Sequence, residues 1–139
     1  MADSSLQARG NAIYQYPGST SLVGVDLSAS RGLLLAADAA GNLTVNASTT
    51  VPAAAICLDG QIATKSSTIG ILELMPGPTF VKLSGTVAPF QRIQQAADGG
   101  VVVDVGPGTA RVVVGRLGDQ GGVAGDIVPA CLCEGNILA

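Results

Sequence analysis

Histidine is absent from the 139-residue chain. Histidine is the commonest general base, the usual partner of a catalytic Ser or Cys, and the commonest metal ligand in proteins. Its absence removes most hydrolase mechanisms and leaves a zinc site without its usual nitrogen ligand. We therefore expect a protein that is not an enzyme, with no catalytic residues, no metal and no cofactor.

Aromatic residues are almost as scarce, because the chain has no Trp, two Phe and two Tyr. Hydrophobic residues nevertheless make up 47% of the sequence. The core must then be built from Val, Ile, Leu and Ala, which favours thin β layers over a core organised on aromatic anchors.

Charge is also low, at 12% of residues, which is about half the usual share. Only seven Lys and Arg occur, they are scattered, and the net charge is −3, so binding to nucleic acid is not expected. The longest uncharged run, residues 39–58, is broken by Gly, Asn, Thr and Pro, so no membrane span is expected either. The N-terminus lacks an apolar signal sequence, which predicts synthesis in the cytoplasm. A surface so poor in charge suggests burial in an assembly.

Short apolar runs separated by Gly, Asn, Asp and Pro fill most of the chain, which is typical of strands and turns. We expect roughly nine or ten strands and no convincing helix, hence an all-β barrel or sandwich. The expected strands are residues 22–26, 31–38, 43–45, 53–58, 69–75, 80–84, 90–95, 101–105, 110–117 and 127–133.

The pattern of residues 33–77 recurs in residues 93–135. Leu43 matches Val101 at a displacement of 58 residues, and the Ala-Ala-Asp triplet of residues 36–38 matches that of residues 96–98. Two copies are too few for a solenoid, so they are expected to be the two similar halves of one compact β domain, residues 22–139.

Residues 1–21 are small and polar and show no periodicity, which predicts a flexible, extended N-terminal arm that contacts a neighbour. The plainer alternative is a frayed terminus. The only large side chains of the arm are Tyr14 and Tyr16, and Pro17 follows in a turn signal.

The sequence gives little evidence for other kinds of site. Cys57, Cys131 and Cys133 are expected to be buried or half-buried thiols, with a disulfide as the alternative. The glycines at residues 115–122 lack the spacing of a phosphate loop, and most Asp residues stand in turns, where they bind nearby amides. A Gly-Ser pair at residues 18–19 is the one feature in common with self-processing β-barrel enzymes.

The order of strands and turns from residue 32 to residue 133 resembles the small capsid decoration, or cement, proteins of tailed bacteriophages. The resemblance rests on the Ala-Asp-Gly-Gly turn at 97–100, the Gly-Pro-Gly-Thr turn at 106–109, the Val-Val-Val-Gly strand at 112–115, and the Val-Lys-Leu-Ser-Gly-Thr-Val link at 81–87. It implies a virion protein that binds the outer capsid surface, usually as a homotrimer, and stabilises contacts between major capsid proteins. The arm would then supply the capsid contact, with Tyr14, Tyr16 and Pro17 as the candidate residues.

Two other classes stay open. Another phage structural module, such as a tail tube, baseplate or fibre tip, would share the β content and the low charge. A small β-barrel enzyme would instead show a concave pocket with convergent polar groups.

Overall fold

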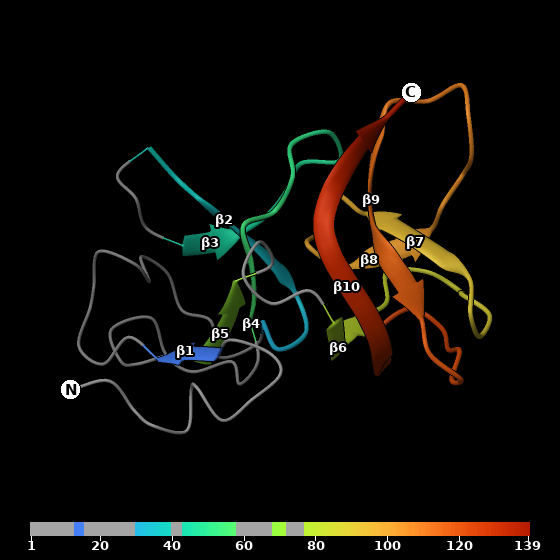
Figure 1. The fold of residues 1–139 in the computed structure, drawn as a ribbon, viewed down its shortest axis with the longest axis horizontal. Coiled ribbons are helices and arrows are strands. Elements are labelled where there is room, and N and C mark those ends of the chain that lie inside the picture. The colour runs from blue at the N-terminus through green and yellow to red at the C-terminus, as the bar shows by residue number, and fades with distance from the viewer. Residues whose placement is uncertain (1–12, 16–29, 40–42, 58–67, 72–76) are drawn as a thin grey trace.

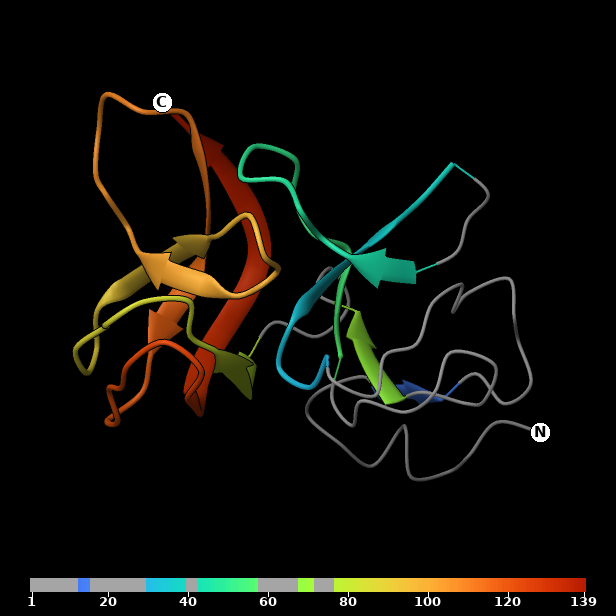
Figure 2. The ribbon, with the colours of Figure 1, turned by 180° about the vertical axis from the view of Figure 1, so that it is seen from behind.

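The computed structural model describes residues 13–15, 30–39, 43–57, 68–71 and 77–139. Every regular element among these residues is a β-strand, and the ten strands form two five-stranded antiparallel sheets that pack together (Figures 1 and 2). The all-β prediction is confirmed, as a sandwich and not as a closed barrel. No helix long and apolar enough to cross a membrane occurs in this part of the chain.

Each sheet is built from one half of the chain. The first sheet contains, in spatial order, β1 (Ile13–Gln15), β5 (Thr68–Ile71), β4 (Ala55–Cys57), β2 (Leu34–Ala37) and β3 (Leu43–Val45). The second contains β6 (Gly77–Lys82), β10 (Ile127–Leu138), β9 (Arg111–Leu117), β7 (Arg92–Gln95) and β8 (Val101–Val103). The two orders are the same when five is added to each strand number, so the halves share one topology.

The repeat is visible in individual hydrogen bonds. The amide of Asn46, which follows β3, donates to the carbonyl of Leu34 at 2.9 Å, and the amide of Asp104, which follows β8, donates to the carbonyl of Arg92 at 2.9 Å. Both pairs are related by the 58-residue displacement that the sequence indicates. The side-chain oxygen of Asn46, and likewise that of Asp104, accepts a hydrogen bond from the backbone amide two residues later in the chain. This is the pattern of an Asx turn.

The structure extends the repeat and corrects one part of its alignment. Each half begins with a further strand, β1 or β6, that precedes the repeated pattern. The structural displacement of 58 residues makes Ala36 equivalent to Gln94 and not to Ala96, so the Ala-Ala-Asp triplets are two residues out of step. Alanine and aspartate are common on both sides of a turn, which makes such a triplet a weak marker of register.

Several strands match their expected ranges, among them β3, β7, β8 and β9. Strand β10 is longer than expected, because it was expected to end at Cys133 and it continues to Leu138. Its pairing with β9 shifts between Leu132 and Asn136, and this bulge lets the strand bend and rejoin its neighbour (Figure 1). The expected strand at 22–26 lies outside the described residues.

One hydrophobic core joins the two sheets, and its members are aliphatic, as the composition predicts. The cluster contains Leu34, Ala53 and Ile56 from the first half and Val81, Leu83, Val87, Ile93, Val101, Val112, Val114, Leu117, Val128, Ala130 and Leu132 from the second. Alternate residues of β9 and β10 supply this face, so a single sheet would leave it exposed to water.

A buried glutamine fastens the halves together. The side chain of Gln95 in β7 is 1% exposed, and its Oε1 accepts a hydrogen bond from the amide of Ala53 at 2.7 Å. Its Nε2 donates to the carbonyls of Ser48 and Val51 at 3.1 and 2.9 Å. One amide side chain of the second half therefore holds three backbone groups in the loop that links β3 to β4.

Two glycines allow the backbones of the halves to approach each other. Gly32 accepts from the amide of Lys82 at 2.9 Å, and Gly99 accepts from the amide of Leu34 at 2.7 Å. Their φ angles are +79° and +85°, in the left-handed region that glycine occupies most easily. A Cβ on Gly32 would lie 2.9 Å from the Lys82 nitrogen, so a larger residue would push the halves apart.

We expect Gln95→Ala to lower the free energy of unfolding by about 3 kcal/mol, because a buried side chain and its three hydrogen bonds to Ser48, Val51 and Ala53 are lost, although the Val51 carbonyl keeps the Asn46 amide as a donor. Urea unfolding followed by far-UV circular dichroism measures the change. Gln120→Ala, at an exposed position, is the control and should change stability by less than about 0.5 kcal/mol. Equal unfolding midpoints for the two variants would show that Gln95 does not fasten the halves.

Candidate binding surface

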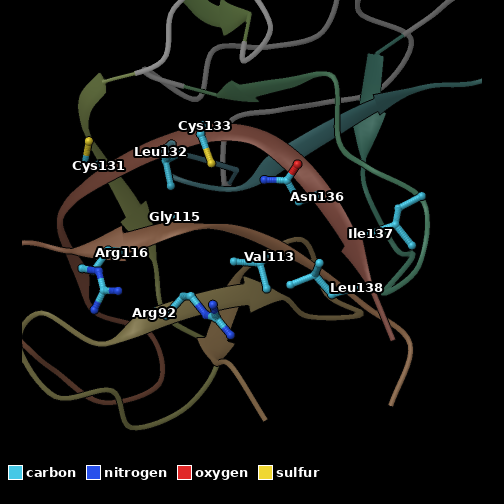
Figure 3. Close-up of a pocket in the computed structure, with 10 residues that line it drawn as sticks. All are labelled: Arg92, Val113, Gly115, Arg116, Cys131, Leu132, Cys133, Asn136, Ile137 and Leu138. Carbon is cyan, nitrogen blue, oxygen red and sulfur yellow. The ribbon is translucent and has the colours of Figure 1, made fainter. Parts of the chain in front are cut away.

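A groove of about 620 Å³ lies on the second sheet, on the face turned away from the core (Figure 3). Alternation along the strands defines that face: Ala130 and Leu132 of β10 enter the core, whereas Cys131 between them is exposed. The groove is lined by Arg92, Val113, Gly115, Arg116, Cys131, Leu132, Cys133, Asn136, Ile137 and Leu138.

The bulge in β10 shapes this groove. Leu132 pairs with Gly115 and Asn136 pairs with Val113, so β10 has two more residues than β9 in the interval. The thiol of Cys133 donates to the Val114 carbonyl at 3.4 Å and satisfies a carbonyl inside the irregular stretch. Gly115 has a φ of +150° and approaches the Cys131 carbonyl so closely that a Cβ there would collide with it.

Three charged side chains meet beside one end of the groove. Asp104 forms ion pairs with Arg92 and with Arg111, and the Arg92 Nε lies 2.6 Å from the Asp104 Oδ2. The side chains of Asp104 and Arg111 are 5% and 3% exposed, whereas that of Arg92 is 46% exposed. The hydrogen bond from Arg111 is the main reason that the pKa of Asp104 falls to about 2. Two guanidinium groups pair with one carboxylate, so the cluster is net positive, and Arg92 is its member that lines the groove.

An aromatic side chain projects into solvent near the same end. Phe90 is 61% exposed and is the one described non-glycine residue with a positive φ, at +64°. It follows Pro89 in a turn closed by a hydrogen bond from the Gln91 amide to the Ala88 carbonyl at 3.4 Å. Glycine or asparagine usually occupies this turn position, and a bulky residue there costs about 1 kcal/mol.

The strained backbone of Phe90 is held on both sides. Its amide donates to the Gly118 carbonyl at 2.9 Å, and its carbonyl accepts from Nη1 of Arg116 at 2.9 Å. These hydrogen bonds hold the Phe90 backbone in its left-handed conformation, which sets the point from which the ring enters the solvent. Sequence reasoning missed Phe90, because the residue was placed at the start of an expected strand; the preceding Pro was the available turn signal.

The structure locates the expected contact residues only in part. Ile13–Gln15, inside the expected arm, form β1, and Tyr14 pairs with Ile69 of β5. Tyr16 and Pro17 lie outside the described residues. The assignment of Tyr14, Tyr16 and Pro17 to a contact therefore stays a prediction.

The three cysteines have different environments. Cys57 is buried in β4, Cys131 is exposed, and Cys133 is half-buried. No group of three or more Cys, Asp or Glu residues is arranged for a metal ion among the residues that the structure describes. Gly115 belongs to β9 and the segment after it leads into β10, so the glycines of residues 115–122 do not precede a helix.

Comparison with known proteins identifies a shared fold. No protein-family model and no curated protein sequence matches the chain. Among solved structures, the chain is similar to the N base of the head fiber gp8.5 of bacteriophage phi29, with a TM-score of 0.59 and 13% sequence identity. The similarity covers 86% of this chain and 93% of the other, so it concerns the whole sandwich. At this identity it establishes the fold alone.

The cluster around Asp104 predicts a specific loss of stability in acid. The pKa of Asp104 is lowered from 3.8 to about 2, so its contribution is complete above pH 4 and is lost as the pH falls through about 2. We expect Asp104→Asn to destabilise the protein at pH 7 by about 2 kcal/mol. The loss is no larger because Arg92 is half-exposed and solvent screens its attraction to Asp104. The difference from the wild type should narrow between pH 4 and pH 2.

Urea midpoints measured at a series of pH values test this prediction. Asp119→Asn, at an exposed position, is the control and should show no such convergence. The pKa of Asp98 is also lowered, chiefly by its hydrogen bond to the Ser84 hydroxyl, so some acid sensitivity should remain in Asp104→Asn. A constant difference between wild type and Asp104→Asn down to pH 2 would contradict the assignment.

Proposed function

We propose that the protein is a virion structural protein of a tailed bacteriophage, which binds the outside of the capsid and stabilises contacts between major capsid proteins. The observation that carries the proposal is the fold, because the whole sandwich is shared with the base of a phage head fiber. That protein is named as part of the head, which favours a location on the capsid over one in the tail.

The surface of the described residues supports a binding role. It combines an apolar groove, an exposed aromatic ring on a rigid turn, and few charges. Contact surfaces of this kind are depleted in charged residues and enriched in aromatic anchors and Arg. A protein with this composition gains stability when its apolar surface is covered in an assembly.

Capsid stabilisation follows from mass action. A protein that binds only the assembled shell stabilises it by RT ln(1 + [L]/Kd) at each site, and many equivalent sites multiply the effect. A homotrimer suits this role, because three linked copies contact three capsid subunits at once and gain avidity.

A second candidate is the base of a longer fibre, which the name of the similar structure favours. Such a base would anchor a projecting fibre to the head and would add little to shell stability. Electron microscopy of particles with and without the protein separates the two functions. A projection that starts at the protein would indicate a fibre base, whereas a compact knob and a more heat-resistant shell would indicate a decoration protein.

We expect the combined substitution of Tyr14, Tyr16 and Pro17 with Ala to reduce binding to empty capsids at least tenfold, because the aromatic anchors are removed. Co-sedimentation with purified capsids measures the binding. Point substitutions are preferred to deletion of residues 1–21, because Ile13–Gln15 pair with β5 and their loss would expose its edge.

Substitution of Ser4, Ser5 and Gln7 with Ala is the control within the same segment and should leave binding unchanged. Equal binding by both variants would remove the arm from the proposed contact. Failure of the wild-type protein to sediment with capsids would contradict the proposed function itself.

A further inference from the structure

The Phe90 turn and the groove lie next to each other on one chain. Arg116 connects them, because its guanidinium donates to the Phe90 carbonyl at 2.9 Å and the same residue lines the groove. The Phe90 ring is 61% exposed and lies outside the hydrophobic core, and the groove is on the face of the second sheet turned away from that core. A strained, well-anchored and exposed aromatic residue is the kind of outlier that points to a function.

Two loops beside Phe90 carry exposed carboxylates. The loop between β6 and β7, residues 83–91, and the loop between β9 and β10, residues 118–126, are joined by hydrogen bonds in both directions between Val87 and Gly122, at 3.0 Å. Val123 in the second of these loops is 56% exposed, and the carboxylates of Asp119 and Asp126 are in exposed positions nearby in sequence. We refer to Phe90 with these two loops as the knob.

The groove is apolar with two guanidinium groups. Val113, Cys131 and Leu138 contribute apolar surface, and Figure 3 shows Arg92 beside Val113 and Leu138, with Arg116 next to it below Cys131. Its volume of about 620 Å³ lies within the range of sites that enclose a small organic group, so a phenyl ring fits inside. The knob thus offers an aromatic ring to an apolar groove, and the carboxylates of Asp119 and Asp126 to the half-exposed guanidinium of Arg92.

We propose that the partner for the groove is a second copy of this chain, with Phe90 of one copy packed into the groove of its neighbour. The contact joins two different patches, so it repeats head to tail, and it closes a ring in which each knob and each groove is used once where the rotation between neighbours divides a full turn. A ring of three is the homotrimer of the proposed function, on which this inference rests. The knob carries carboxylates and the groove carries guanidinium groups. Contact between a knob and a groove is therefore favoured over contact between two knobs.

Phe90→Gly is the first test, because glycine accepts a φ of +64° without strain and only the ring is lost. We expect association to weaken at least about thirtyfold, as for other central aromatic anchors, while the thermal midpoint changes by less than about 3 °C. Phe90→Tyr should keep the oligomer. Val51→Ala is the matched control, because Val51 is exposed to a similar degree, at 58%, on the other half of the chain.

Mixing two defective variants is the sharper test. Phe90→Gly lacks the knob, whereas Cys131→Trp fills the groove from an exposed position and keeps the knob. Each variant alone should be monomeric, and an equimolar mixture should form a one-to-one dimer, because a single intact knob meets a single intact groove. Mass measured by light scattering after size-exclusion chromatography distinguishes monomer, dimer and trimer.

The outcomes separate this inference from the proposed function when capsid co-sedimentation is measured in parallel. A wild-type oligomer that Phe90→Gly leaves intact would overturn the knob-and-groove contact and leave the capsid role untouched. An intact oligomer with lost capsid binding would likewise overturn it and assign Phe90 to the capsid protein. A monomeric wild type would overturn it together with the proposed trimer, and a monomeric Phe90→Gly that forms the mixed dimer would support it.

Discussion

The amide side chain of Gln95 is the interaction on which the arrangement of the two sheets depends. It is almost fully buried, and each of its hydrogen bonds ends on the backbone of the opposite half. In a region of low dielectric such bonds are strong when all partners are present and costly when one is missing. Aliphatic packing drives the two sheets together but permits more than one relative orientation. The Gln95 hydrogen bonds and the close backbone contacts at Gly32 and Gly99 select one of these orientations.

The two halves share a scaffold and differ in what they display. Leu34 and Arg92 accept equivalent backbone hydrogen bonds, yet Leu34 is buried in the core and Arg92 faces the groove. Asn46 and Asp104 make the same kind of turn, yet only Asp104 has charged partners. The halves share a framework, and the residues that line the groove belong to the second half alone.

The exposed features of the second half are those on which the proposed contacts depend. Charged residues are few, and the amide and the carbonyl of Phe90, whose side chain is exposed, are both hydrogen-bonded. Arg92 and Arg116 line an apolar groove, and their guanidinium groups would orient a partner that carries negative charge.

The sequence by itself determined the strands, many of the turns and the repeat, because alternation and turn chemistry act over a few residues. The hairpin turn at Gly99 and the strand Leu43–Val45 are examples. Only the tertiary structure decided that the halves form a sandwich, that Gln95 faces a distant loop, and that Phe90 takes a left-handed conformation. These depend on which remote backbone groups come within bonding distance, and the bulge that opens the groove depends on the register between β9 and β10. No local pattern encodes that register, because it is set by packing across the whole domain.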